Sequence, residues 1–125
     1  MKFLLDTNVL IWFFEGSPRL NQLRDLFSFD DTEVYISCVS WWEIAIKIKI
    51  GKLPLDFPLL KTFIGRYNFV ELPVTGDYIE AYLELPDLHR DPFDHILLAQ
   101  AISRHMRLVT GDALLADYSS LVMVI

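Results

Sequence analysis

The sequence predicts an α/β protein of three layers, an α/β/α sandwich in which a central parallel sheet of about five strands lies between two layers of helices. Two observations predict this class. Short apolar runs alternate along the chain with longer segments whose apolar residues recur at helical spacing. Gly, Pro and Asp residues separate these segments. A chain of 125 residues has the usual size of one domain, so we expect a single domain over residues 1–125.

Five apolar runs predict the strands of the sheet. The run at residues 34–36 carries the β-branched and aromatic side chains that favour strands. The other four are short apolar segments. The predicted strands cover residues 3–5, 34–36, 69–72, 108–109 and 121–125.

Six segments with apolar residues at helical spacing predict the helices, and turn residues mark their ends. Pro18 and Pro92 stand at first-turn positions, where proline is tolerated. Gly16 and Gly51 follow the last periodic residues of two segments, and Pro86 follows another. The predicted helices cover residues 9–14, 18–27, 41–50, 58–67, 76–85 and 92–106.

The composition indicates a contact with another chain. Apolar residues make up 53% of the sequence, above the typical range of about 45–50%. A small protein shows such a surplus on its surface, so we expect a partner or self-association. No apolar run approaches the roughly 20 residues that cross a bilayer, and Cys38 has no second cysteine to pair with. We therefore expect a cytoplasmic protein with no membrane partner.

The charge argues against a passive nucleic-acid-binding module. The 17 acidic and 11 basic residues give a net charge of −6, which opposes binding to phosphates. If four of the acids surround divalent cations, the remaining 13 against 11 leave −2. Local basic clusters can override that remainder; the candidates are Lys47, Lys49 and Lys52, and Arg90, Arg104 and Arg107.

Four acidic residues follow predicted strands or open predicted helices. Asp6 follows the predicted strand at residues 3–5, and Asp112 follows the predicted strand at residues 108–109. Glu43 and Asp94 lie in first turns of predicted helices. In an open parallel sheet, ligands bind at the rim formed by the carboxyl ends of the strands. The sequence therefore predicts that these four acids converge on one rim.

Clustered carboxylates suit Mg²⁺ or Mn²⁺, which prefer oxygen ligands and usually keep bound waters. Two such ions roughly 4 Å apart would activate a water and stabilise the leaving oxygen of a phosphodiester, so we expect a nuclease. Zinc is not expected, because His89, His95 and His105 have no cysteine partners and lack the H-E-x-x-H spacing. The sequence also lacks a Gly-rich phosphate loop and a G-x-S-x-G elbow.

Helix capping is the alternative role for each of these acids. Acids near helix N-termini satisfy free backbone N–H groups and complement the helix dipole. Ser40 and Glu43 match the capping-box pattern S-x-x-E. Asp91 before Pro92 reads as a cap rather than a ligand. Asp112 has the pattern of a cap for a short helix, and Asp6 that of the first residue of the helix after it.

Four motifs together resemble the PIN-domain family, and they occur in order over nearly the whole chain. They are Leu4–Leu10, Ser40–Ile44, Asp91–Asp94 and Val109–Asp112. The VapC-type toxins of toxin–antitoxin modules, which are single-domain ribonucleases, are the most similar members. The resemblance implies a PIN-like fold and endoribonuclease activity on RNA.

The resemblance also implies roles for particular residues and partners. Asp6, Glu43 and Asp94 would form the triad that binds Mg²⁺ or Mn²⁺, with Asp112 as a fourth acid. Thr7, Asn8 and Thr110 would support that site. His95 is a departure, since many relatives carry Arg at this position. A small cognate antitoxin would inhibit the enzyme, and together with the apolar surplus the family predicts a homodimer.

Two other functions compete with the nuclease. A receiver-like phosphoacceptor domain has a similar length and Mg²⁺-binding acids at strand ends. It also places a lysine after a late strand, whereas the last lysine here is Lys61. The second alternative is a non-enzymatic module that binds RNA or a protein, in which the acids serve only as helix caps.

Overall fold

The structure, a computed structural model, describes residues 1–87 and 91–125. Two residues named in the predictions lie outside the described residues: His89, which was not expected to bind zinc, and Arg90, which was expected in a basic cluster. The strands are β1 (Lys2–Leu5), β2 (Glu33–Ser37), β3 (Val70–Leu72), β4 (Arg107–Thr110) and β5 (Val122–Val124). The α-helices are α1 (Thr7–Glu15), α2 (Asn21–Phe27), α3 (Cys38–Lys49), α4 (Phe57–Ile64), α5 (Gly76–Leu83) and α6 (Pro92–Arg104). Two 3₁₀ helices, η1 (Pro18–Leu20) and η2 (Ala113–Asp117), complete the described elements.

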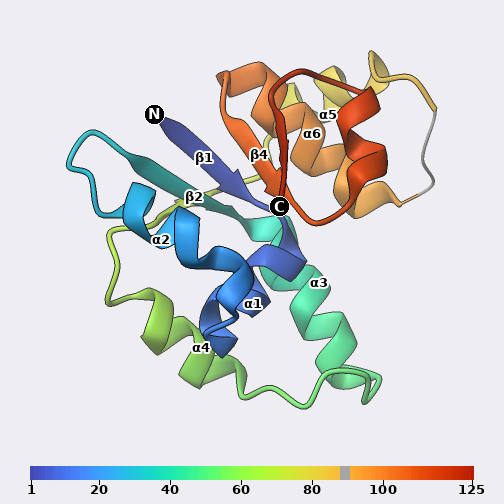
Figure 1. Cartoon of the computed structure of the whole chain (residues 1–125). Helices are drawn as coiled ribbons and strands as arrows, with labels where there is room; N and C mark the ends of the chain where they lie inside the picture. The colour runs from blue at the N-terminus through green and yellow to red at the C-terminus, as the bar shows by residue number, and fades with distance from the viewer. Residues whose placement is uncertain (88–90) are drawn as a thin grey trace.

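All described strand pairs are parallel, and the sheet has the order β3-β2-β1-β4-β5 (Figure 1). In the middle, Leu4 of β1 pairs with Tyr35 of β2 on one side and Leu108 of β4 on the other. The chain moves outward from β1 to β3 and then returns to the opposite side of β1 to form β4. Such a reversal leaves a crevice at the carboxyl ends of the two strands beside it, here β1 and β4. The receiver-like alternative predicts the order 2-1-3-4-5 and is therefore wrong.

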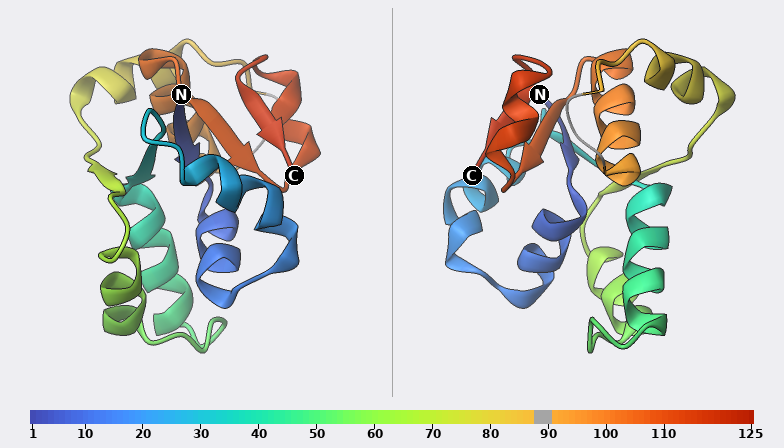
Figure 2. Two further views of the ribbon diagram at one scale, coloured as in Figure 1. Left: turned by 60° about the vertical axis from the view of Figure 1, so that its left-hand side comes forward. Right: turned by 90° about the vertical axis from the view of Figure 1, so that its right-hand side faces the viewer.

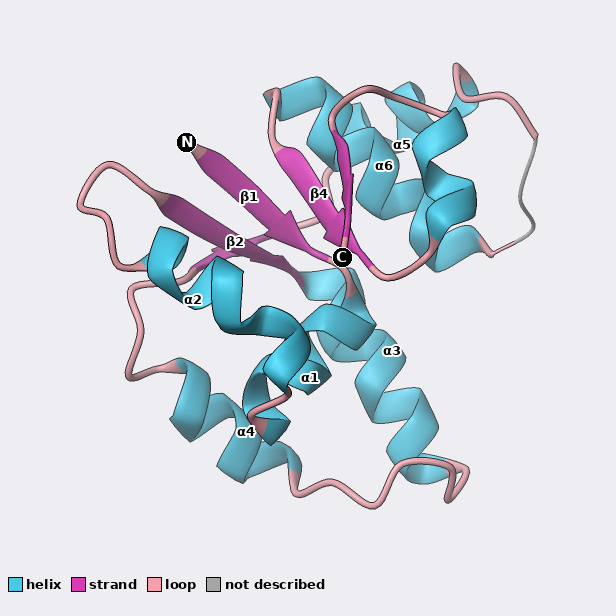
Figure 3. Cartoon of the chain, in the orientation of Figure 1, coloured by secondary structure: helices cyan, strands magenta, loops and turns pink. Residues whose placement is uncertain are grey.

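Helices cover both faces of the sheet, which confirms the predicted α/β/α sandwich (Figure 3). One face carries α1, α2 and α4, and the other carries α5, α6 and η2 (Figures 1 and 2). Successive strand residues point to opposite faces, so Phe3 and Leu5 pack in the first core and Leu4 packs in the second. Helix α3 contributes to both, through Ile44 in the first and Val39 in the second.

Most helix boundaries differ from the predictions by one to three residues, and two of these differences have a clear local cause. Helix α3 begins at Cys38, three residues earlier than expected, because the Ser37 side chain accepts the backbone N–H of Val39 and caps the helix there. The last long helix ends at Arg104, since His105 adopts the left-handed conformation with φ 52° and terminates it. No helix within the described residues is long and apolar enough to cross a membrane.

Candidate active site

Asp6 stands at the carboxyl end of β1, in the crevice that the strand order creates. Its backbone N–H donates to the carbonyl of Val109 at 2.9 Å, which ties it to β4. Asp6 precedes α1, yet its side chain makes no capping hydrogen bond to that helix. Its Oδ2 instead accepts the Thr110 hydroxyl at 2.6 Å. Asp6 thus begins the helix with its backbone, as the alternative expects, but its side chain is bound by Thr110 and does not cap α1.

The Asp6 carboxyl is 5% exposed, and its pKa is raised above its ordinary value. Burial is the main cause, because it disfavours the charged form. The hydrogen bond from Thr110 lowers the pKa, whereas the negative charges of Glu43 and Asp91 raise it further. Asp6, Glu43 and Asp91, from three separate parts of the chain, are therefore close enough for their charges to interact.

Thr110 joins the two acids that follow β1 and β4. It is fully buried; its hydroxyl donates to Asp6 and accepts the backbone N–H of Asp112 at 3.0 Å. Asp112 in turn caps η2, since its Oδ1 accepts the N–H of Leu114 at 3.0 Å. The capping alternative is thus confirmed for Asp112. The expected support from Thr110 has a structural basis, because it fixes the orientation of Asp6.

Glu43 lies in the second turn of α3, not the first, because the helix begins at Cys38. The predicted capping box is wrong, since Ser40 lies inside the helix and accepts the Thr7 hydroxyl at 3.0 Å. That bond joins the start of α1 to α3. Glu43 Oε2 pairs with Lys47 Nζ at 3.3 Å, while Oε1 is buried and has no hydrogen-bond partner among the described residues.

The start of α6 separates two acids by one helical turn. Asp91 is the N-cap, and its Oδ1 accepts the N–H of Phe93 at 2.9 Å, which confirms the predicted cap. Asp94 lies inside the first turn and is 8% exposed. Because Asp91 acts on the pKa of Asp6, the beginning of α6 lies near the carboxyl end of β1.

The remaining predicted residue, Asn8, is exposed at the start of α1. Sequence reasoning missed three contacts around this edge. Lys47 follows Glu43 by four residues, a spacing that signals an ion pair on a helix. His95 contacts the Tyr118 hydroxyl at 3.2 Å and so joins α6 to the end of η2. Trp12 lies against Gly111, and no sequence pattern signals that contact.

The site fits a divalent cation in its chemistry, although the side chains do not enclose one. In residues 1–87 and 91–125, no three His, Cys, Asp or Glu side chains lie together as a metal-binding group. Two observations nevertheless suit a hard cation with oxygen ligands. One oxygen of Glu43 is buried without a hydrogen-bond partner among the described residues. The Asp6 carboxyl is buried and repelled by the negative charges of Glu43 and Asp91. In this arrangement Glu43 is directed to Lys47 instead. A joint role for the four acids as ligands stays a prediction.

Known proteins resemble this chain in both sequence and fold. Residues 3–121 match the PIN domain family. Ribonuclease VapC22 of Mycobacterium tuberculosis is 26% identical over 117 residues, which cover 92% of this chain and 90% of that protein. A tRNA(fMet)-specific endonuclease, VapC of Shigella flexneri, is 25% identical over 118 residues, covering 90% of this chain and 87% of its own. The solved structure of VapBC2 from Rickettsia felis, bound to a DNA fragment from their promoter, shares the fold with a TM-score of 0.78, 18% identity, and coverage of 100% and 98%.

Proposed function

Because the chain belongs to the PIN domain family, we propose that it is a Mg²⁺- or Mn²⁺-dependent endoribonuclease and the toxin of a toxin–antitoxin pair. It acts in the cytoplasm as one domain over residues 1–125. The names of the two ribonuclease relatives support the activity and its RNA substrate. The observation that carries the proposal is the Asp6 carboxyl, which is buried at the crevice between β1 and β4 without capping a helix.

The chain's own residues would hold the ion and position the substrate. Asp6, Glu43 and Asp94 supply carboxylate oxygens, which Mg²⁺ and Mn²⁺ prefer. When bound, the ion lowers the pKa of a water that attacks the phosphodiester and stabilises the leaving oxygen. Thr110 keeps Asp6 Oδ2 in one orientation through its 2.6 Å hydrogen bond. Lys47 holds the Glu43 carboxylate in an ion pair at 3.3 Å.

A non-enzymatic binding module is the second candidate, and the caps made by Asp91 and Asp112 favour it. That function accounts for only those two acids. It gives no reason for the burial of Asp6, whose side chain caps no helix, or for the unpartnered oxygen of Glu43. Burying such groups is unfavourable unless a ligand compensates for the cost, so the nuclease explains more of the site.

A cleavage assay tests the nuclease proposal directly. The purified chain should cut RNA in the presence of Mg²⁺ or Mn²⁺ and stop when a chelator is added. Thermal melts give an independent readout, because an ion that binds only the folded state stabilises it by about 2.7 kcal/mol at a hundredfold excess over Kd. Cleavage that survives chelation, or a melting temperature that ignores both ions, would refute the metal-dependent mechanism.

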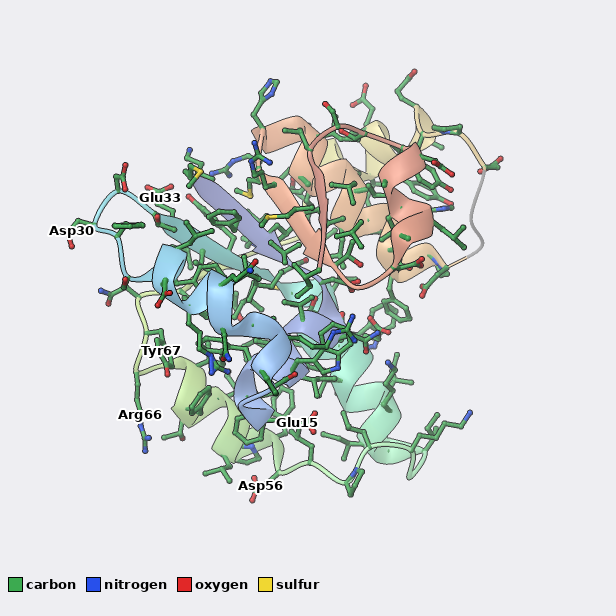
Figure 4. All side chains as sticks on the ribbon, in the orientation of Figure 1. Glu15, Asp30, Glu33, Asp56, Arg66 and Tyr67 are labelled. Carbon is green, nitrogen blue, oxygen red and sulfur yellow. The ribbon has the colours of Figure 1, made fainter. Side chains whose placement is uncertain are left out.

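The antitoxin would bind an apolar groove on the first face of the sheet. A cavity of about 880 Å³ lies between α1, the segment before β2 and the segment before β3. Aromatic residues line it, among them Phe13, Phe63 and Phe69. Figure 4 shows Arg66 and Tyr67 on the α4 side of this region, with Asp30 and Glu33 on the opposite side. Solved toxin–antitoxin complexes with this fold support such a partner.

Self-association would use a different surface, on α3. Trp42 is 61% exposed on this helix, and Ile50 at its end is also exposed. Light scattering after size exclusion should give the mass of a dimer for the chain alone. Co-expression with the neighbouring reading frame should give a complex in which RNA cleavage is inhibited. A monomer would contradict the dimer, and full activity in the complex would contradict inhibition.

A further inference from the structure

Arg19, in the 3₁₀ turn η1, lies at the same edge of the sheet as the acids. Its Nη2 donates to the backbone carbonyl of Ile125 at 3.1 Å. The backbone N–H of Ile125 donates to the carbonyl of Thr110 at 2.9 Å, and Thr110 is the residue that orients Asp6. A short series of hydrogen bonds therefore connects an exposed guanidinium to the crevice between β1 and β4.

A tryptophan holds this guanidinium against the turn that carries Asp112. The guanidinium carbon of Arg19 lies 4.0 Å from the centre of the Trp12 ring. The same ring lies on the backbone of Gly111: a Cβ there would fall 2.4 Å from Trp12 Cη2 and 3.4 Å from Arg19 Nη2. Any larger residue at this position would have to displace the Trp12 ring. Trp12 and Arg19 thus pack directly on the turn between Thr110 and Asp112.

The arrangement suits a phosphate. A guanidinium presents a planar set of five N–H donors that matches phosphate oxygens, and the Ile125 carbonyl takes a donor on one nitrogen only. Stacking on Trp12 fixes the plane in advance, so less side-chain freedom is lost on binding. Among the ion pairs of the described residues, Lys2 and Lys47 each pair with a glutamate, whereas no aspartate or glutamate side chain pairs with Arg19.

The chain's charge favours a cation near the rim for an RNA substrate. The net charge of −6 and the acids at the rim repel a polyanion, and metal ions neutralise only the phosphate at the reacting bond. We propose that Arg19 binds a phosphate of the RNA strand beside the one that is cut, and that Trp12 and Gly111 hold its guanidinium in place. This inference rests on the proposed ribonuclease function and adds a substrate-binding residue to it.

Three variants test the role of Arg19. Arg19→Gln removes the charge and the planar set of donors, while Arg19→Lys keeps the charge alone. Arg66→Gln is the matched control, because Arg66 is an exposed arginine that follows α4 and belongs to neither basic cluster proposed for RNA. Binding is measured by fluorescence anisotropy with a fluorescein-labelled single-stranded RNA of mixed sequence and chelator, over a series of salt concentrations. KM, kcat with Mg²⁺ and the melting temperature are measured on the same proteins.

Arg19→Gln should weaken RNA binding roughly 10-fold, as expected for one charged hydrogen-bonded contact. The slope of log K against log salt should fall by about 0.7, the contribution of one phosphate of a single strand. KM should rise with kcat and melting temperature unchanged. Arg19→Lys should keep the salt slope and lose part of the affinity, and Arg66→Gln should match the parent chain.

Two results would overturn the inference while leaving the ribonuclease intact. In the first, the parent chain cleaves RNA and Arg19→Gln binds RNA as tightly as the parent does. The other is a loss of kcat with unchanged binding, which would mean that Arg19 only stabilises the turn at Gly111. A parent chain that neither binds nor cleaves RNA would refute the proposed function itself, and Arg19 with it.

Discussion

The carboxyl edge of β1 and β4 and the aromatic cluster under α1 and α4 are built in opposite ways. At the edge, Asp6 and Asp94 are buried carboxyl groups, and one oxygen of Glu43 is buried without a hydrogen-bond partner among the described residues. The aromatic cluster consists of rings that contact one another, with Phe13 at its centre; its members are Phe13, Phe27, Phe63, Tyr67 and Phe69.

The difference separates where the fold gains stability from where it carries chemistry. Burying aromatic rings in mutual contact is favourable, and each ring pair adds about 0.5–1.5 kcal/mol beyond the area it buries. Burying carboxylates near like charges is unfavourable without a compensating cation. Substitutions in the cluster should therefore change stability and spare activity, and substitutions at the edge should do the reverse.

The largest effect is expected for Asp94→Asn. Removing one carboxylate ligand should lower kcat about 10³-fold or more, which corresponds to about 4 kcal/mol in activation free energy. The matched control is Asp77→Asn, since Asp77 is also an acid in the first turn of a helix, α5, but is exposed. Equal activity losses in RNA cleavage by the two variants would contradict the assignment.

The next effect is expected in the aromatic cluster. Phe13→Ala should lower the free energy of unfolding by about 3–4 kcal/mol, in the lower part of the range for Phe→Ala because the rings around it line a cavity and can relax. Urea denaturation measures this loss, and Phe13→Leu should keep much of the unfolding free energy that Phe13→Ala loses. RNA cleavage per folded molecule should stay within a few fold of the parent. A stable protein that has lost cleavage would show that the two regions are not separate.

A smaller effect concerns the pH dependence that Asp6 imparts. Burial, and then the charges of Glu43 and Asp91, raise its folded-state pKa, whereas the unfolded value stays near about 3.9. Above that value the folded state binds more protons than the unfolded state, so Asp6 destabilises the fold increasingly as pH rises through the folded-state pKa. With chelator present, Asp6→Asn should equal the parent in unfolding free energy at acid pH and exceed it progressively toward neutrality. A difference in urea melts that does not change with pH would contradict the raised pKa.

The smallest effect is expected at Asp91, one turn from Asp94. Asn caps helices nearly as well as Asp, so Asp91→Asn should change stability by only a few tenths of a kcal/mol, while Asp91→Ala should cost about 1 kcal/mol. RNA cleavage by Asp91→Asn should remain within a few fold of the parent, in contrast to Asp94→Asn. If the Asp91 and Asp94 variants lose kcat equally, the cap also acts in catalysis.

The sequence by itself determined the class of fold and the family. Short apolar runs and helical spacing are local patterns, and they located all five strands and the helices between them to within a few residues. The resemblance carried by the motifs around Asp6, Glu43, Asp94 and Asp112 is confirmed by the family match over residues 3–121. Local rules also identified Asp91 as a cap, because a cap depends only on the residues next to it.

Only the tertiary structure decided what each polar group at the edge does. Asp6 has the sequence pattern of a cap, yet its side chain bonds Thr110, which lies 104 positions away along the chain. Ser40 matches a capping box, yet it bonds Thr7 because Ser37 caps the helix earlier. The stack of Arg19 and Trp12 on Gly111 brings together η1, α1 and the turn after β4. Such contacts depend on the order of strands in the sheet, which pairing between distant segments determines and local periodicity does not encode.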